Sequence, residues 1–303
     1  MKINGKESSM KIKQKKIISH LIGGLGNQLF QYATSYALAK ENNAKIVIDD
    51  RLFKKYKLHG GYRLDKLNII GEKISSIDKL LFPLILCKLS QKENFIFKST
   101  KKFILEKKTS SFKYLTFSDK EHTKMLIGYW QNAIYFQKYF SELKEMFVPL
   151  DISQEQLDLS IQIHAQQSVA LHVRRGDYIS NKNALAMHGI CSIDYYKNSI
   201  QHINAKLEKP FFYIFSNDKL WCEENLTPLF DGNFHIVENN SQEIDLWLIS
   251  QCQHHIIANS TFSWWGAWLA NSDSQIVITP DPWFNKEIDI PSPVLSHWLK
   301  LKK

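Results

Sequence analysis

Two adjacent arginines in the segment 172–178, HVRRGDY, are the residues best suited to do chemistry. Arg174 and Arg175 are half of the four arginines in a chain whose other 35 cationic side chains are lysines. A guanidinium presents a planar fork of donors that grips two phosphate oxygens, whereas the lysine ammonium is a mobile point charge. The apolar run 168–171 predicts a buried strand, so the pair lies at its carboxyl end, where open α/β sheets bind ligands. The pattern favours an anionic ligand over the alternative, a surface salt-bridge pair.

A glycine-rich segment, GGLGNQ at 23–28, lies between a predicted strand at 16–22 and a predicted helix that ends near Lys40. Gly24 and Gly26 belong to this turn. Asn27 and Gln28 fall in the first helical turn, where side-chain amides and free backbone N–H groups can meet a ligand. A plain structural turn is the alternative. With the strand expected at 44–50, the segment forms one βαβ unit, which predicts a parallel sheet.

The same turn raises the possibility of an NAD-dependent oxidoreductase. Asp49 and Asp50 end the next strand, near the place where a ribose-binding acid is expected. Against this, Leu29 stands where the dinucleotide fingerprint needs a third glycine for close packing of helix and strand.

Polar side chains also follow two later predicted strands, at 211–215 and 256–258. In the segment FSND, Asn217 precedes Asp218, whose carboxylate could accept the N–H groups of a guanine edge or bind a ribose. A simple Asx-type helix start is the other interpretation. The segment 259–263, NSTFS, opens a helix, and such an N-terminus with its free N–H groups is a phosphate site. Ordinary N-capping would look the same there.

The sequence lacks an Asp-x-Asp motif, with which many nucleotide-sugar enzymes hold a divalent ion on the diphosphate. We therefore expect no metal and no cofactor, so that cationic side chains neutralise a departing diphosphate. His254 and His255 have no suitably spaced partners and are expected to be structural. The absence of a Gly-x-Ser-x-Gly elbow and of a Walker lysine loop argues against hydrolase and P-loop kinase functions.

Composition indicates a soluble globular protein, and the alternation of predicted strands and helices indicates an α/β fold of two domains. The chain has 44% apolar and 23% charged residues, four dispersed cysteines typical of free thiols in a reducing cytoplasm, and a net charge of +9. That charge favours nucleotides or acidic lipids, and nucleic acid is the weakest candidate partner. We expect a disordered basic segment at 1–16, Rossmann-like domains at 17–155 and 156–303, and inserted helices and loops over 70–127.

Together these motifs closely resemble the bacterial α-1,2-fucosyltransferases of glycosyltransferase family 11. The segments that carry the resemblance, in order, are GGLGNQLFQ (23–31), GYWQ (128–131), HVRRGDY (172–178), HGIC (188–191), FSND (215–218) and NSTFSWWGAW (259–268). The resemblance implies a GT-B-like fold with an acceptor-side N-terminal domain and a C-terminal domain that holds GDP-L-fucose. It also implies metal-independent, inverting transfer of L-fucose to O2 of a terminal galactose.

Site residues follow from the same resemblance, position by position. Arg174 and Arg175 would bind the diphosphate, and Asp177 is our first candidate for the catalytic base, with His188 the second. The remaining residues implied in the donor site or the cleft are Asn27, Arg63, His172, Asn217, Asp218, Asn259, Ser260, Thr261 and Ser263, together with Gly24, Gly26 and Gln28 of the glycine-rich turn.

Three rival functions stay open: a transferase of the same fold with another GDP-sugar, the NAD-dependent oxidoreductase, and a non-catalytic nucleotide- or carbohydrate-binding module. The expected acceptor is a galactose-terminated oligosaccharide or lipid-linked glycan, such as an O-antigen repeat unit. The expected location is the cytoplasm, with peripheral contact at the anionic inner face of the membrane. Nucleic acid is not an expected partner.

Overall fold

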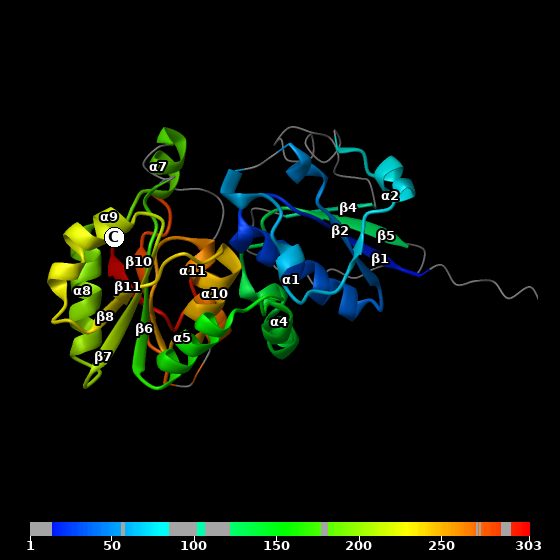
Figure 1. Ribbon diagram of the computed structural model, residues 1–303. Coiled ribbons are helices and arrows are strands. Elements are labelled where there is room, and N and C mark those ends of the chain that lie inside the picture. The colour runs from blue at the N-terminus through cyan, green and yellow to red at the C-terminus, as the bar shows by residue number, and fades with distance from the viewer. Residues whose placement is uncertain are drawn as a thin grey trace, which may run out of the picture.

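Two parallel β-sheets lie side by side in the computed structural model (Figure 1). The structure describes residues 14–55, 58–84, 102–106, 122–176, 181–270, 272, 274–285 and 292–303. The expected disordered segment at 1–16 therefore lies largely outside the described residues, and Lys16 already belongs to the first strand.

The N-terminal half builds a five-stranded sheet with strand order β3-β2-β1-β5-β4. Helix α1 packs on one face, against Ile17 and Leu21, and Phe82 packs on the other, near Ile18 and Met125. The elements of this half are β1 (Lys16–His20), α1 (Leu25–Glu41), β2 (Lys45–Asp49), β3 (Glu72–Lys73), α2 (Ser76–Leu81), β4 (Phe103–Leu105), β5 (Thr123–Ile127) and α4 (Phe140–Met146).

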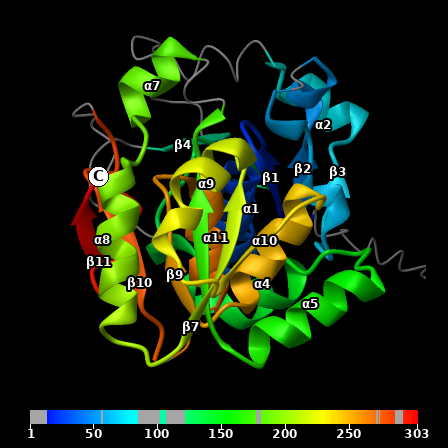
Figure 2. The same ribbon diagram turned by 60° about the vertical axis from the view of Figure 1, so that its left-hand side comes forward.

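The C-terminal half builds a six-stranded sheet with strand order β11-β10-β9-β6-β7-β8. Figure 2 shows helices on both faces of this sheet. The elements are α5 (Gln154–His164), β6 (Gln167–Val173), α7 (Lys182–His188), α8 (Ile193–Asn204), β7 (Pro210–Ser216), α9 (Lys219–Asn225), β8 (Phe234–Ile236), α10 (Gln242–Gln251), β9 (His254–Ile256), α11 (Thr261–Ala270), β10 (Val277–Asp281) and β11 (Leu299–Lys302).

The α/β class with two facing parallel sheets is confirmed. The expectation of only helices and loops over 70–127 is wrong, because β3, β4 and β5 all come from this stretch and pair in the first sheet. These strands were missed because the first two span only two and three residues, too few for a period-2 pattern to appear.

One aromatic core joins the two halves. Trp264 and Trp265 of α11 are fully buried, and Phe30 of α1 lies with its ring centroid 4.6 Å and 4.9 Å from theirs. Phe136 stacks on Trp265 at 5.1 Å. Buried aromatic pairs contribute beyond the area that they remove from water. The tryptophans of α11 are therefore core, and they fix α11 against the first half of the chain.

Candidate functional site

The starts of α1 and α11 press against each other where the two halves meet. A Cβ on Gly26 would lie 2.6 Å from the Phe262 nitrogen and 2.6 Å from the Thr261 carbonyl carbon. The Trp265 indole N–H donates to the Gly26 carbonyl at 3.0 Å. Only a residue without a side chain permits this approach. Two helix N-termini, each the positive end of its helix dipole, therefore converge at one place.

Gln28 shapes the loops around this place. Its side chain is fully buried, and its amide donates to the carbonyl oxygens of Gly23 at 3.0 Å and Gly61 at 2.8 Å. The Arg63 backbone N–H donates to the Gln28 amide oxygen at 3.0 Å. With all three contacts inside the protein, Gln28 holds the glycine-rich turn to the segment 59–63.

Asn27 is partly exposed, and a turn after β5 positions it. The Asn27 amide oxygen accepts from the Gln131 side chain at 2.9 Å. Glu106 holds that turn, since its carboxylate accepts the backbone N–H groups of Tyr129 at 2.6 Å and Trp130 at 2.9 Å. Burial raises the pKa of Glu106, and the two N–H donors lower it in part.

Arg63 reaches the opposite half of the chain. Its guanidinium donates to the carboxylate of Glu243, with Nη2 2.7 Å from Oε1 and Nε 3.1 Å from Oε2. Next to it, the Gln242 amide donates to the His59 carbonyl at 3.2 Å. The first turn of α10 thus binds the segment 59–63 through two side chains. Arg63, predicted to line the cleft, therefore lies at the boundary between the halves.

The structure brings Arg175, Asn217 and Asp218 together at the ends of β6 and β7. Arg175 Nε lies 3.5 Å from an Asp218 carboxylate oxygen, and its guanidinium lies 4.2 Å from the centre of the Trp221 ring. The Asn217 amide oxygen accepts the Arg175 backbone N–H at 3.1 Å. Asp218 also caps α9 by accepting the Trp221 N–H. Arg175 is therefore held by α9, and Arg174 precedes it as a partly exposed residue.

The polar residues at the start of α11 separate into two groups. Asn259 and Ser263 are buried, and the Asn259 amide donates to the carbonyl oxygens of His188 at 2.6 Å and Trp283 at 3.3 Å. The Ser263 hydroxyl donates to the Ala258 carbonyl at 3.4 Å. These two side chains therefore form hydrogen bonds within the protein and do not face the predicted ligand.

The other two hydroxyls lie at the helix start itself. Ser260 is also buried, and its hydroxyl accepts the Phe262 N–H at 3.3 Å, whereas Thr261 is partly exposed. Among the predicted phosphate ligands on α11, Thr261 is thus the hydroxyl best placed to meet solvent.

The two predicted histidines lie at different places. His172 is buried at the end of β6, with its ring 5.4 Å from that of Phe262. His188 ends α7, and its backbone carbonyl accepts from the Lys303 ammonium at 2.6 Å. Asp177 lies outside the described residues.

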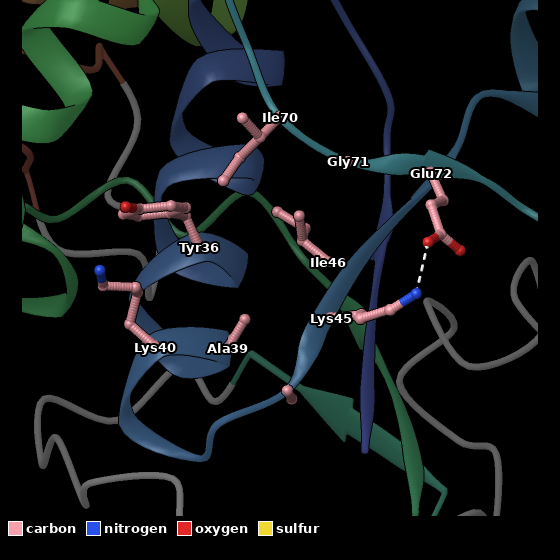
Figure 3. Close-up of a pocket in the computed structure, with 9 residues that line it drawn as sticks. Tyr36, Ala39, Lys40, Lys45, Ile46, Ile70, Gly71 and Glu72 are labelled. Atoms are coloured by element: carbon pink, nitrogen blue, oxygen red, sulfur yellow. Dashed lines mark hydrogen bonds and ion pairs between the residues drawn. The ribbon is translucent and has the colours of Figure 1, made fainter. Parts of the chain in front are cut away.

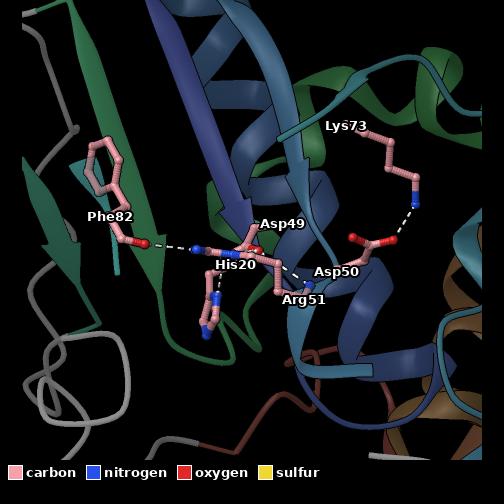
Figure 4. Close-up of polar contacts among 6 residues, drawn as sticks. All are labelled: His20, Asp49, Asp50, Arg51, Lys73 and Phe82. Carbon is pink, nitrogen blue, oxygen red and sulfur yellow. Dashed lines mark hydrogen bonds and ion pairs between the residues drawn. The ribbon is translucent and has the colours of Figure 1, made fainter. Parts of the chain in front are cut away.

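Asp49, the acid considered for a dinucleotide ribose, has a different use (Figure 4). It is fully buried, and its carboxylate lies 2.8 Å from His20 Nδ1 and 2.6 Å from Arg51 Nε. Burial favours a higher pKa, but the hydrogen bonds from Arg51 and His20 outweigh it and lower the pKa of Asp49 to about 2. This occupied carboxylate argues against an NAD-binding role. Asp50 pairs with Lys73.

A groove of about 320 Å³ lies between the second half of α1 and the edge of the first sheet that β2 and β3 form (Figure 3). Tyr36, Ile46 and Ile70 line it, and the Lys45–Glu72 ion pair at 2.7 Å borders it. None of the predicted site residues lines this groove. Within the described residues there is no group of three or more His, Cys, Asp or Glu placed to hold a metal ion. No described helix is long and apolar enough to cross a membrane.

Comparison with known proteins decides the family. The model of Glycosyl transferase family 11 matches residues 3–301. The chain belongs to this family. It is 40% identical to an alpha-1,2-colitosyltransferase of Escherichia coli, over 95% of this chain and 99% of the relative. It is also 31% identical to the O-antigen biosynthesis glycosyltransferase WbnK of Escherichia coli, over 88% of this chain and 94% of that protein.

Among solved structures, a mutant of Arabidopsis thaliana FUT1 in complex with GDP shares the fold. Its TM-score is 0.50 at 11% identity, and the match covers 89% of this chain and 71% of that one. The family 11 transferase described here is thus a GT-B-like protein, and the resemblance drawn from its motifs is confirmed.

Sequence reasoning missed three contacts of this site. Glu243 and Gln242 lie on α10, where nothing in the local pattern distinguishes them from solvated helix residues. Trp221 had a usable signal, because it lies three residues after the helix-capping Asp218 and so falls in the first turn of α9.

Proposed function

We propose that this family 11 transferase moves L-fucose from GDP-β-L-fucose to O2 of a terminal galactose, with inversion and without a metal ion. The observation that carries the proposal is the convergence of the α1 and α11 starts at Gly26. This place lies beside the end of β6, since the His172 ring is 5.4 Å from that of Phe262, and β6 leads directly into the arginine pair. A donor diphosphate is the ligand that two helix N-termini and an adjacent arginine pair suit best.

Arg174 has the main electrostatic role in this proposal. Cleavage of the glycosidic bond builds negative charge on the departing GDP and positive charge on the sugar ring. Donors already oriented toward the diphosphate stabilise that charge without reorganisation. Thr261 and the N–H groups of α11 would supply further donors on the same oxygens.

Arg175 would contact the nucleotide part of the donor, next to Arg174. Its guanidinium lies over Trp221 and next to Asp218, so its position is set before the donor binds. With Asp218 and Asn217 it would face the ribose or the guanine base. Asn27, held by Gln131, would reach the phosphate or the sugar from the acceptor-side half.

The acceptor hydroxyl must lose its proton as the new bond forms. Asp177 is our first candidate for the base and His188 the second. His188 lies at the end of α7, after the arginine pair in the chain, and the Asn259 amide donates to its backbone carbonyl. A pH–rate profile of His188→Gln tests His188 as the base. If the fall in rate at low pH is the same as in the wild-type protein, His188 is not the base and Asp177 is the candidate that is left.

A second donor deserves a direct comparison, because the 40% identical relative is a colitosyltransferase. Colitose differs from L-fucose by the absence of the hydroxyl at C3. A pocket that hydrogen-bonds that hydroxyl rejects the deoxy sugar by a factor on the order of 10⁴, whereas an apolar pocket rejects the added hydroxyl only about 100-fold. The ratio of kcat/KM for GDP-fucose and GDP-colitose therefore identifies the natural donor.

The test is to incubate the protein with GDP-fucose, GDP-colitose or GDP-mannose and β-1,3- and β-1,4-linked galactosides, with and without EDTA. We expect an α-1,2-linked fucosyl product of the correct mass, in equal yield with EDTA. Preference for GDP-colitose would reassign the donor, and loss of product in EDTA would overturn the metal-independent mechanism. Protection from thermal unfolding by NAD but not by GDP would overturn the transferase proposal.

A further inference from the structure

Formal charge is divided unequally between the two halves of the chain. Residues 1–150 contain 28 Lys and Arg against 13 Asp and Glu, whereas residues 151–303 contain 11 against 17. The net charge of +9 thus combines an excess of 15 positive charges in the acceptor-side half with six negative charges in the other half. A partner that responds to charge is expected to meet the N-terminal half.

Helix α2 presents an exposed apolar face on that basic half. Ile77, Leu80 and Leu81 are 72%, 81% and 44% exposed, on a helix of only six residues that also carries Lys79. Three large apolar side chains so exposed on one short helix form a patch of the kind that marks a protein or membrane contact.

The helix is fixed with this face outward. Asp78, 3% exposed, forms an ion pair with Lys16 at 2.9 Å and accepts from the Ser75 hydroxyl at 2.6 Å. Burial favours a higher pKa for Asp78, but its contacts with Ser75 and Lys16 outweigh it and hold the pKa below its usual value. The carboxylate therefore stays ionised at neutral pH and ties α2 to the first strand.

We propose that the α2 face docks this protein on an anionic lipid bilayer, with Ile77, Leu80 and Leu81 entering the interface and the lysine-rich half facing the headgroups. Apolar insertion and attraction of lysines to anionic lipid act together in peripheral proteins, because neither alone gives stable binding. A protein partner would call for matched polar contacts, whereas here an exposed apolar patch belongs to the half of the sequence that carries the excess of positive charge, which suits a membrane.

This orientation agrees with the position of the donor site. Both views place α2 and α7 at the upper side of the molecule (Figures 1 and 2), and α7 follows the arginine pair along the chain. A bilayer against α2 would therefore lie on the same side of the molecule as α7, the helix that follows the arginine pair. Docking on a bilayer goes beyond the transfer reaction, and the binding measurement itself needs no sugar donor.

Sedimentation with vesicles of phosphatidylglycerol and phosphatidylethanolamine, compared with phosphatidylcholine vesicles, tests the docking. The variant carries Ile77→Glu and Leu80→Glu. The matched control carries Ile161→Glu and Leu220→Glu, at side chains 64% and 70% exposed in the C-terminal half. Each double variant adds two negative charges, so a difference in vesicle binding between the two variants depends on where the charges lie and not on the net charge.

We expect the wild-type protein and the control to sediment with the anionic vesicles only, less so in high salt, and the α2 variant to partition at least about ten-fold more weakly. Equal sedimentation with both vesicle types, or equal losses in the two variants, would overturn the proposal. Leu80→Ser repeats the comparison without added charge if the double variant does not fold. Fucose transfer to a soluble galactoside should be the same in all of them.

Discussion

Arg63 and Glu243 form a two-pronged ion pair between the halves of the chain, although 180 positions separate them in the sequence. Their side chains are 21% and 8% exposed. The Arg63 backbone also holds Gln28, which in turn holds the glycine-rich turn. The pair therefore links the relative position of the halves to the loop that would meet the donor.

Removing one partner of this pair should destabilise the protein and impair transfer. Arg63→Ala leaves the Glu243 carboxylate buried without its cation, and we expect the free energy of unfolding to fall by about 2–4 kcal/mol. Urea denaturation of both single variants and of the exchange Arg63→Glu with Glu243→Arg measures the coupling. The exchange should recover part of the loss, whereas strictly additive losses would show that the two side chains act independently.

Gly26→Ala should separate the two helix starts. The new methyl group would lie 2.6 Å from backbone atoms of Thr261 and Phe262, which cannot rotate away. We expect a loss of about 1–3 kcal/mol in unfolding free energy from overpacking, together with a raised KM for the donor. Gly24→Ala is the matched control, because its Cβ would meet the His59 side chain and no backbone atom, with the His59 Cβ at 3.2 Å. Equal behaviour of the two variants would remove the special role of Gly26.

The sequence alone predicted the α/β class, most long elements and the segments at the strand ends, because hydrophobic periodicity and terminal polar residues are local signals. The helix expected to end near Lys40 is α1, which ends at Glu41. What sequence patterns could not provide is the destination of each side chain. Asn259 and Gln28 are polar residues of the motifs, yet both side chains form hydrogen bonds to backbone carbonyl groups inside the protein.

Contacts between the halves were equally inaccessible. Neither the Arg63–Glu243 pair nor the Trp265–Gly26 hydrogen bond has a periodic signature, since each depends on how two separately folded sheets pack. The three tryptophans of α11 likewise enter a core that belongs mainly to the other half, and nothing in their spacing indicates that destination.

Asp49 should make the protein acid-sensitive. Its pKa falls from about 3.8 in the unfolded chain to about 2 in the folded protein, because the Arg51 and His20 hydrogen bonds outweigh the effect of burial. A lowered pKa gives stability that is complete above the unfolded value and is lost as the pH falls from about 4 to 2. This contribution amounts to about 2 kcal/mol.

Acid unfolding followed by circular dichroism checks this expectation. At pH 7, Asp49→Asn should be less stable than the wild-type protein by about that amount, and the difference should shrink below pH 3. Asp65→Asn is the control, since Asp65 is an exposed carboxylate of the same half. A stability difference between Asp49→Asn and the wild-type protein that stays constant down to pH 2 would contradict the assignment.

Arg174→Lys isolates guanidinium geometry from charge. The substitution keeps one positive charge but removes the planar fork, so the departing diphosphate loses a donor that is aligned before the reaction begins. We expect kcat to fall by about 100–1000-fold with a melting temperature close to that of the wild-type protein. Arg51→Lys is the structural counterpart: Arg51 binds Asp49 inside the first half, so its loss should lower stability more than kcat. Near-normal turnover in Arg174→Lys, assayed with GDP-fucose and a galactoside, would mean that Arg174 does not stabilise the leaving group.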